Sequence, residues 1–194
     1  MSRDYNMLHM IQNNMAGVDK RAIDAVSRMY ERLEKRECYA SCVSTSVTLV
    51  LAFKYMSLNP KLILGTVQYQ GISHPHAWIE LDGKIFDLAI SVDIKYHPVL
   101  KEREMQRIEP IINLTHDEAV NNVKYYPYQF GGTWKVSNMY QLVGKTMKEY
   151  ADASPVFDIW ADICYILDIS ETAENLTILE HLAEQEIIRD KEIM

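Results

Sequence analysis

Residues 42–69 read CVSTSVTLVLAFKYMSLNPKLILGTVQY, and a second stretch at 76–89 reads HAWIELDGKIFDLA. The run at 42–56 is too long for a typical strand, and its length predicts a buried helix. The residues SLNP at 57–60 end that helix with turn-forming side chains. Residues 61–69 have the composition of a strand, so the first stretch predicts a helix followed by a strand.

The second stretch has the pattern of a β-hairpin. Residues 76–81 and 84–89 are predicted strands, and Asp82-Gly83 between them is the expected two-residue turn. This turn fixes the register of the hairpin and is expected to pair Ile79 with Phe86. Because side chains alternate between the two faces of a strand, the register also decides which polar groups meet.

The predicted register gathers polar side chains on one face of the hairpin. His76, Trp78 and Glu80 share that face with Asp87. Asp87 is a diagonal neighbour of His76, with backbones roughly 7–8 Å apart, and the small Ala89 opposite His76 leaves its ring room to lean. Asp87 also lies between two apolar residues, where a carboxylate generally needs a partner. The hairpin alone still fits an ordinary half-exposed sheet with a polar face.

The order of elements predicts an α+β fold, with helices on either side of a small antiparallel sheet. We expect a single domain at 1–194, with its core at about 19–114 and a C-terminal helical extension at about 115–194. Residues 90–114 have no clear pattern. Further helices are predicted at 19–36, 116–124, 138–151 and 171–190, and a loop at 125–134. Thr115 and Glu118 form a capping box for the second of these helices, and Ser137 is the expected N-cap of the third. One more helix is expected to begin after the N-cap Ser154, with Pro155 in its first turn.

The composition is that of a soluble globular protein. Of 194 residues, 48% are hydrophobic and 24% are charged, and the net charge is −7. This charge disfavours binding to nucleic acid phosphates. We see neither a membrane-spanning run nor a secretory signal, and three cysteines do not make a disulfide framework. We therefore expect a cytoplasmic protein that binds neither nucleic acid nor membrane; its oligomeric state stays open.

Two cysteines are candidates for a nucleophile. Cys38 and Cys42 both lie near the start of the predicted buried helix. A cysteine there gains from the positive end of the helix dipole and from free backbone N–H groups, which can also hold an oxyanion. For either cysteine alone, a structural place in the core is the commoner role. Cys164 lies within an apolar run and is expected in the core.

A metal site is the rival interpretation of the histidines. His74 and His76 form an H-x-H pair, which on one strand would direct both rings to the same side. Pro75 between them, however, favours a place for His74 in the loop before the strand. No matching cysteine or histidine pair follows nearby. We therefore expect no metal and no other cofactor.

Together the two stretches resemble the transglutaminase-like branch of the papain-like cysteine protease superfamily. In that family a cysteine opens an apolar helix, and a loop and a strand with a basic residue and then a glycine follow. A His-Ala-Trp-hydrophobic-Glu motif and an aspartate on the next strand complete the pattern. Here the basic residue is Lys61 and the glycine is Gly65. The separation between Cys42 and Gly65 is the one expected of the family, whereas Cys38 lies too far away.

The resemblance implies a papain-like/transglutaminase-like core, with the catalytic cysteine at the start of a buried helix packed on a small antiparallel sheet and with additional N- and C-terminal helices. It selects Cys42 as the nucleophile, His76 as its base and Asp87 as the acid that orients the imidazole. The implied chemistry is covalent acyl transfer through a thioester, with the Cys42 backbone N–H helping to hold the oxyanion.

The resemblance also suggests residues around the reacting groups. Trp78, beside His76, and Tyr39, just before the helix, are expected to line the substrate site. Glu80 is the alternative orienting acid. The sequence departs from the family in having Ala40-Ser41-Cys42 where Gly-x-Cys is usual. It also lacks a clear upstream Gln or Trp for the oxyanion hole.

The resemblance covers roughly residues 38–90, and its members include crosslinking enzymes, peptidases, amidases and the leader-peptide proteases of lasso-peptide biosynthesis. The layout here is most similar to the last group. We expect a cysteine hydrolase, a peptidase or amidase, acting on a peptide or protein. Transglutaminase-type transfer to an amine, glutamine deamidation and a non-catalytic peptide-binding module on the same fold are the alternatives.

Overall fold

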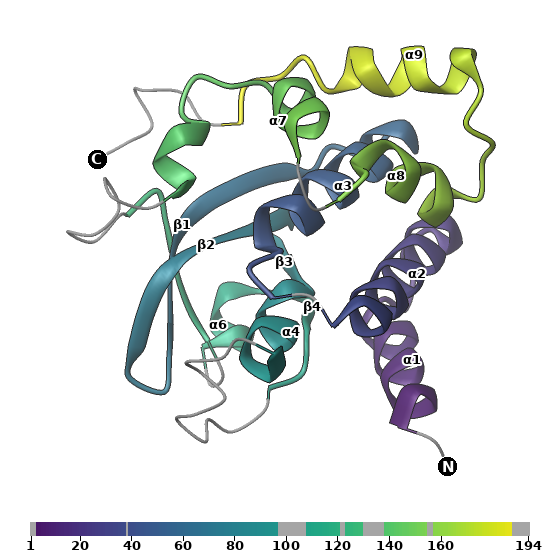
Figure 1. Cartoon of the computed structure of the whole chain (residues 1–194). Coiled ribbons are helices and arrows are strands. Elements are labelled where there is room, and N and C mark those ends of the chain that lie inside the picture. The colour runs from purple at the N-terminus through teal and green to yellow at the C-terminus, as the bar shows by residue number, and fades with distance from the viewer. Residues whose placement is uncertain are drawn as a thin grey trace.

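The apolar run that begins at Cys42 forms helix α3 (Cys42–Tyr55), as its length predicts. Its residues are buried from Cys42 to Phe53, which is typical of a helix covered on all sides. The structure is a computed structural model that describes residues 3–37, 39–96, 108–120, 123–129, 138–154 and 157–187. In it, α3 lies between the sheet and helices α2 (Lys20–Arg36) and α8 (Ile159–Leu167) (Figure 1). The helix thereby fixes Cys42 inside the fold.

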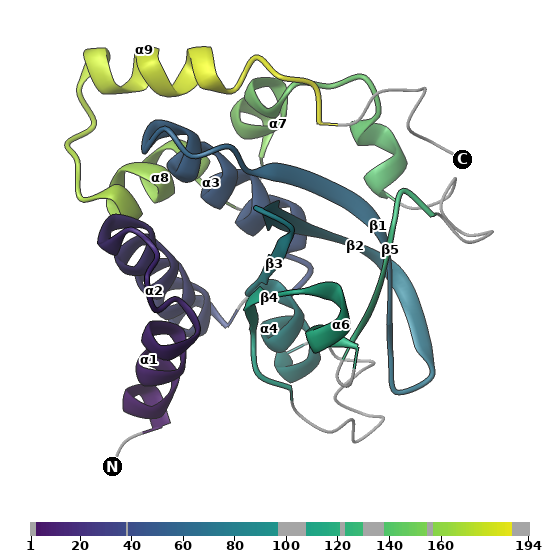
Figure 2. The same cartoon turned by 180° about the vertical axis from the view of Figure 1, so that it is seen from behind.

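Within the described part of the chain, the strands form one curved antiparallel sheet of five strands, in the order β4-β3-β2-β1-β5 (Figure 2). The sequence predicted an α+β fold, and its combination of helices with an antiparallel sheet is confirmed. The strands are β1 (Lys61–Tyr69), β2 (Ile72–Leu81), β3 (Lys84–Asp87), β4 (Ile111–Leu114) and β5 (Lys124–Pro127). β1 and β2 make a long hairpin that curves beside α3 (Figure 1).

The turn at Asp82-Gly83 has the predicted register. Ile79 pairs with Phe86, and the φ angles of Asp82 and Gly83 are 52° and 74°. Positive φ at both positions is what a two-residue hairpin turn with the right twist requires. β3 is shorter than predicted, because the chain turns into helix α4 (Ala89–Tyr96) directly after Asp87.

The remaining helices surround this centre. α1 and α2 lie on the side of α3 away from the curved hairpin, and α9, at the top of Figure 1, contacts α3. Their bounds are α1 (Arg3–Asn14), α6 (His116–Ala119), the 3₁₀ helix η2 (Asn138–Leu142), α7 (Met147–Ala153) and α9 (Ala173–Leu182).

Several predicted boundaries were wrong. The expected loop at 125–134 contains most of β5, which pairs with β1, so the sheet extends into the segment expected to be a helical extension. The helix predicted at 138–151 is divided into η2 and α7. α8 begins at Ile159, capped by Asp158 rather than by Ser154, because the Asp158 side chain accepts the Ala161 N–H. Ser137 and Pro155 lie outside the described residues, so their roles at helix starts stay predictions.

The two faces of the sheet contact different apolar clusters. Ala77 and Ile79 of β2 join α3 in the larger cluster. Trp78 packs on the opposite face with Ile85 and Tyr125. The alternation of β2 therefore separates the helix-packed face from the face that carries Trp78.

Candidate active site

Cys42 is the first residue of α3 and is 8% exposed. The N-cap residue Ser41 makes no side-chain hydrogen bond to the helix start, and the Thr45 N–H donates to the Ser41 carbonyl at 2.8 Å. The amides of residues 42–44 thus precede the first helical hydrogen bond, where backbone donors are left for other acceptors. The predicted environment of the thiol, a helix N-terminus, is confirmed.

The turn before Cys42 is held by an acid that the sequence did not single out. Ala40 has a left-handed φ of 55°, and its N–H donates to Asp93 Oδ1 at 2.7 Å. Asp93 lies on α4 and is 6% exposed. A left-handed conformation is costly for alanine, so the buried hydrogen bond helps to hold this turn.

His76 and Asp87 form a buried pair. His76 Nε2 lies 2.8 Å from Asp87 Oδ2, and both side chains are at most 1% exposed. Asp87 is fixed in turn, since Oδ2 accepts from the Tyr125 hydroxyl at 2.8 Å and Oδ1 accepts from the Ile90 N–H at 3.1 Å. The acid therefore ends β3, begins α4 and orients the imidazole at the same time.

The other nitrogen of His76 faces the thiol. His76 Nδ1 lies 3.9 Å from Asp93 Oδ2, and one ligand atom each of Cys42, His76 and Asp93 lie within 4.8 Å of one another. The described residues offer Nδ1 no hydrogen bond of ordinary geometry. This arrangement places a thiol, an imidazole and two carboxyl groups around one buried point.

Burial and neighbouring charges shift the pKa of both His76 and Asp93 at this point. Burial alone would lower the pKa of His76, but Asp87 and Cys42 outweigh burial and raise that pKa well above its usual value. Burial raises the pKa of Asp93 to about 6, against the influence of His76 and the Ala40 amide. An imidazolium is therefore favoured next to Cys42 at neutral pH.

Gly65 is required by close packing beside the histidine. It pairs with His76 across β1 and β2 and with Pro127 across β1 and β5. A Cβ at this position would lie 2.3 Å from the Tyr126 carbonyl oxygen and 2.8 Å from the Trp78 ring. The glycine thus lets β5 and Trp78 pack against the strand that supports His76.

Trp78 and Glu80 contact each other on the strand that carries His76. Trp78 is fully buried, packs on the Tyr125 ring and donates to Glu80 Oε1 at 3.3 Å. Glu80 also contacts His116 Nε2 at 2.8 Å. The orienting contact to His76 is made by Asp87, and Trp78 supports the sheet behind that pair.

Tyr39 is 50% exposed and lines a groove of about 840 Å³. Ala40 and Ser44, on either side of Cys42 in the chain, line the same groove, and its other walls include Tyr150 and Phe157. Ser44 Oγ and the Tyr150 hydroxyl are 2.7 Å apart, so α7 is tied to the first turn of α3. The groove reaches the helix end that carries the thiol.

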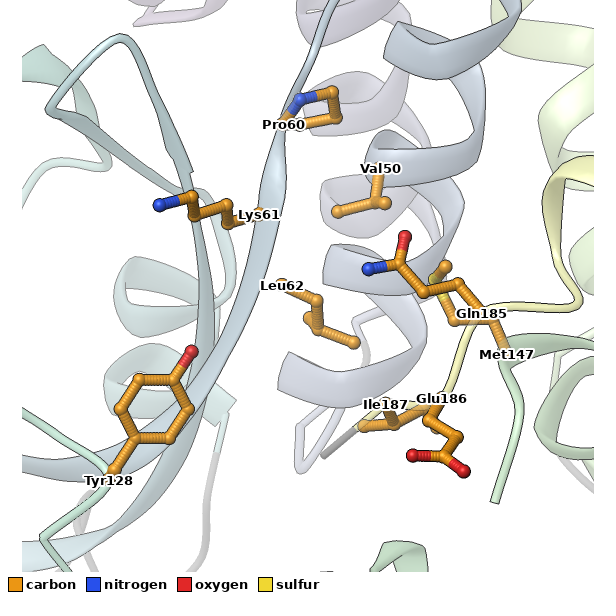
Figure 3. Close-up of a pocket in the computed structure, with 9 residues that line it drawn as sticks. All are labelled: Val50, Pro60, Lys61, Leu62, Tyr128, Met147, Gln185, Glu186 and Ile187. Carbon is orange, nitrogen blue, oxygen red and sulfur yellow. The ribbon is translucent and has the colours of Figure 1, made fainter. Parts of the chain in front are cut away.

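A second cavity of about 280 Å³ lies along α3, roughly two helical turns beyond Cys42. Figure 3 shows Val50 of α3 and Leu62 of β1 pointing into the space between helix and strand, with the chain after α9 closing it. Val50, in the middle of α3, is the helix residue in its wall, and the cavity shares no lining residue with the groove at Cys42.

The H-x-H pair does not have the predicted placement. His74 lies in β2 opposite Val67, not in a preceding loop, and its ring is 5.6 Å from that of His76. Pro75 has no backbone N–H to donate to a neighbouring strand. It is tolerated because β3 pairs with residues 79–81, at the other end of β2, so no described strand on the β3 side takes a hydrogen bond from position 75. The described residues that could hold a metal are Cys42, His76 and Asp93.

The other cysteines lie in different parts of the chain. Cys164 is buried in α8, as expected of a core residue. Cys38 lies outside the described residues. Asp93 and Tyr125, which the sequence did not single out, are parts of the site; an acid within the apolar run LAISVDI was the one signal for Asp93.

Comparisons with known protein families, with curated proteins and with solved structures gave no match. The site is therefore interpreted from its own geometry. Among the residues that the structure describes, no helix is both long and apolar enough to cross a bilayer.

Proposed function

We propose that the protein is a cysteine hydrolase that cleaves a peptide or amide bond through a thioester on Cys42. The observation that supports this most is the order of groups: Asp87 holds Nε2 of His76, and Nδ1 faces the buried thiol at the start of α3. A nucleophile, a base and a third group that orients the base are the parts that covalent acyl transfer needs.

The reaction would begin with a proton on His76 and a thiolate on Cys42. The thiolate attacks the substrate carbonyl, the C–S bond forms, and the carbonyl oxygen becomes an oxyanion near the amide of Cys42. His76 gives its proton to the leaving nitrogen as the C–N bond breaks. Water then attacks the thioester, His76 accepts a proton from it, and the acid product leaves Cys42 free.

The groove beside Tyr39 offers room for the acyl part of the substrate. It opens at Ala40 and Ser44, next to the nucleophile, and has aromatic walls from Tyr150 and Phe157. Pockets that are mostly apolar with a few polar groups are typical substrate sites. We place the substrate chain there, with its scissile carbonyl over the first turn of α3.

A mixture of unstructured peptides tests this function. Wild-type protein should cleave some of them and carry a covalent acyl adduct on Cys42 that mass spectrometry detects after acid quenching. Cys42→Ser should remove both cleavage and adduct, whereas the matched Cys164→Ser should keep both. Cleavage that persists in Cys42→Ser would overturn the proposal.

A further inference from the structure

Asp93 has no part in the acyl transfer just described, yet it faces the same buried point as the nucleophile and its base. Cys42, His76 and Asp93 come from α3, β2 and α4, and each is at most 8% exposed. One ligand atom of each lies within 4.8 Å of the other two. A thiol, an imidazole and a carboxylate thus converge from three separate elements.

His76 has the orientation of a metal-bound histidine. Metal-ligating imidazoles usually donate their second N–H to a carboxylate, which directs the remaining nitrogen to the ion. Asp87 accepts from Nε2 at 2.8 Å and is itself held by Tyr125 and Ile90. Nδ1 is fully buried, makes no hydrogen bond of ordinary geometry with the described residues, and lies 3.9 Å from Asp93 Oδ2. The unsatisfied nitrogen therefore points at the other two ligands.

We infer that Cys42, His76 and Asp93 bind one Zn²⁺ ion, which blocks the thiol. Sulfur, imidazole and carboxylate together suit Zn²⁺ rather than Mg²⁺ or Ca²⁺, and three protein ligands leave a fourth position for water. Tetrahedral Zn²⁺ holds such ligand atoms roughly 3.3–3.6 Å apart. The ligand atoms here lie within 4.8 Å of one another, so they need to close by up to about 1.5 Å, which side-chain torsions can supply.

The ion would replace the one proton that Nδ1 and the sulfur hold between them and take up the sulfur lone pair that attacks a substrate. Zn²⁺ would therefore act as a reversible inhibitor. That consequence rests on the proposed function, whereas the binding itself does not. The two are separable because binding can be measured without a substrate.

Titration with Co²⁺, a coloured substitute for Zn²⁺, tests the site in a protein with Cys38→Ser and Cys164→Ser. We expect one equivalent to produce a thiolate-to-cobalt band and the visible bands of four-coordinate Co²⁺, and Zn²⁺ to bleach both. Cys42→Ser should abolish the thiolate band. Asp93→Asn, which keeps an oxygen for the Ala40 N–H, should weaken Zn²⁺ binding by about tenfold or more. Asp152→Asn on α7 is the matched control and should leave binding unchanged.

Alkylation of the wild-type protein measures Zn²⁺ binding at Cys42 without any substitution in the site. Zn²⁺ should slow iodoacetamide labelling of Cys42 by about tenfold or more and leave Cys164 unaffected. Fast labelling of Cys42 that Zn²⁺ does not slow would overturn the zinc site and leave the hydrolase proposal intact. A thiolate–cobalt band in a protein without peptide cleavage would support the zinc site and count against the hydrolase. A thiolate band that survives Cys42→Ser would also overturn the inference.

Discussion

Asp93 and Ala40 are joined by a 2.7 Å hydrogen bond that holds the chain just before Cys42. Ala40 occupies a left-handed conformation, with φ of 55°, which glycine adopts more readily than alanine. The buried acid on α4 is the feature that makes alanine tolerable at this position.

Ala40→Gly should be neutral or stabilising, because relief of left-handed strain of about 1–2 kcal/mol offsets the added flexibility of glycine. Chemical denaturation measures the change in the free energy of unfolding. Ala161→Gly, in the right-handed helix α8, is the control and should destabilise by roughly 0.5–1 kcal/mol. Equal losses in both variants would contradict the role given to φ at Ala40.

Asp93→Asn should change how stability depends on pH. A carboxyl whose folded pKa is raised binds its proton more tightly when folded, so its contribution is favourable below pH 3.8 and is lost as pH rises to about 6. The difference between these pKa values corresponds to about 3 kcal/mol of stability lost above pH 6.

The variant should therefore be more stable than wild type near pH 7.5, and its advantage should shrink toward zero near pH 3.5. Urea unfolding at the two pH values measures both differences. An advantage that is the same at both would mean that ionisation of Asp93 is not the cause.

Tyr125→Phe removes a donor to Asp87 but leaves the His76 contact. The loss should be about 1.5–3 kcal/mol in unfolding free energy, since the acceptor is a charged carboxylate. Selective labelling of Cys42 should persist because Asp87 still orients His76. Tyr150→Phe, which removes a neutral bond to Ser44, should cost only about 1 kcal/mol. The reverse order of the two losses would argue against an ionised Asp87.

Gly65→Ala should destabilise the fold severely, by about 3 kcal/mol or more, since the added methyl would overlap the Tyr126 carbonyl. Gly71→Ala separates this clash from backbone strain. Gly71 has a φ of 80°, and an added methyl there would meet no atom within 4 Å, so only about 1–2 kcal/mol should be lost. Thermal unfolding compares the two, and a Gly65→Ala protein as stable as Gly71→Ala would rule out the close approach.

Local patterns predicted the centre of the fold. The apolar run at 42–56, the strand at 61–69 and the Asp82-Gly83 turn all depend on neighbours in the chain, and all three are confirmed. The register of the turn was enough to bring His76 and Asp87 together on one face. The structure then places the two side chains in direct hydrogen-bond contact.

Contacts between distant segments were not predictable in the same way. Tyr125 reaches Asp87 only because β5 adds to the edge of β1, and its sequence, rich in tyrosine and proline, has the composition of a loop. Asp93 reaches Ala40 because the chain turns into α4 directly after Asp87. Both depend on tertiary pairing, which a single sequence does not encode in its local periodicity.

Activation of Cys42 by His76 is tested most directly by the rate of iodoacetamide labelling at each cysteine, followed by peptide mass spectrometry at mildly acidic pH. We predict that Cys42 reacts faster than Cys38 and Cys164, that His76→Ala abolishes the difference, and that His74→Ala largely keeps it. Slow and equal labelling of all three cysteines in the wild-type protein would show that His76 does not activate Cys42.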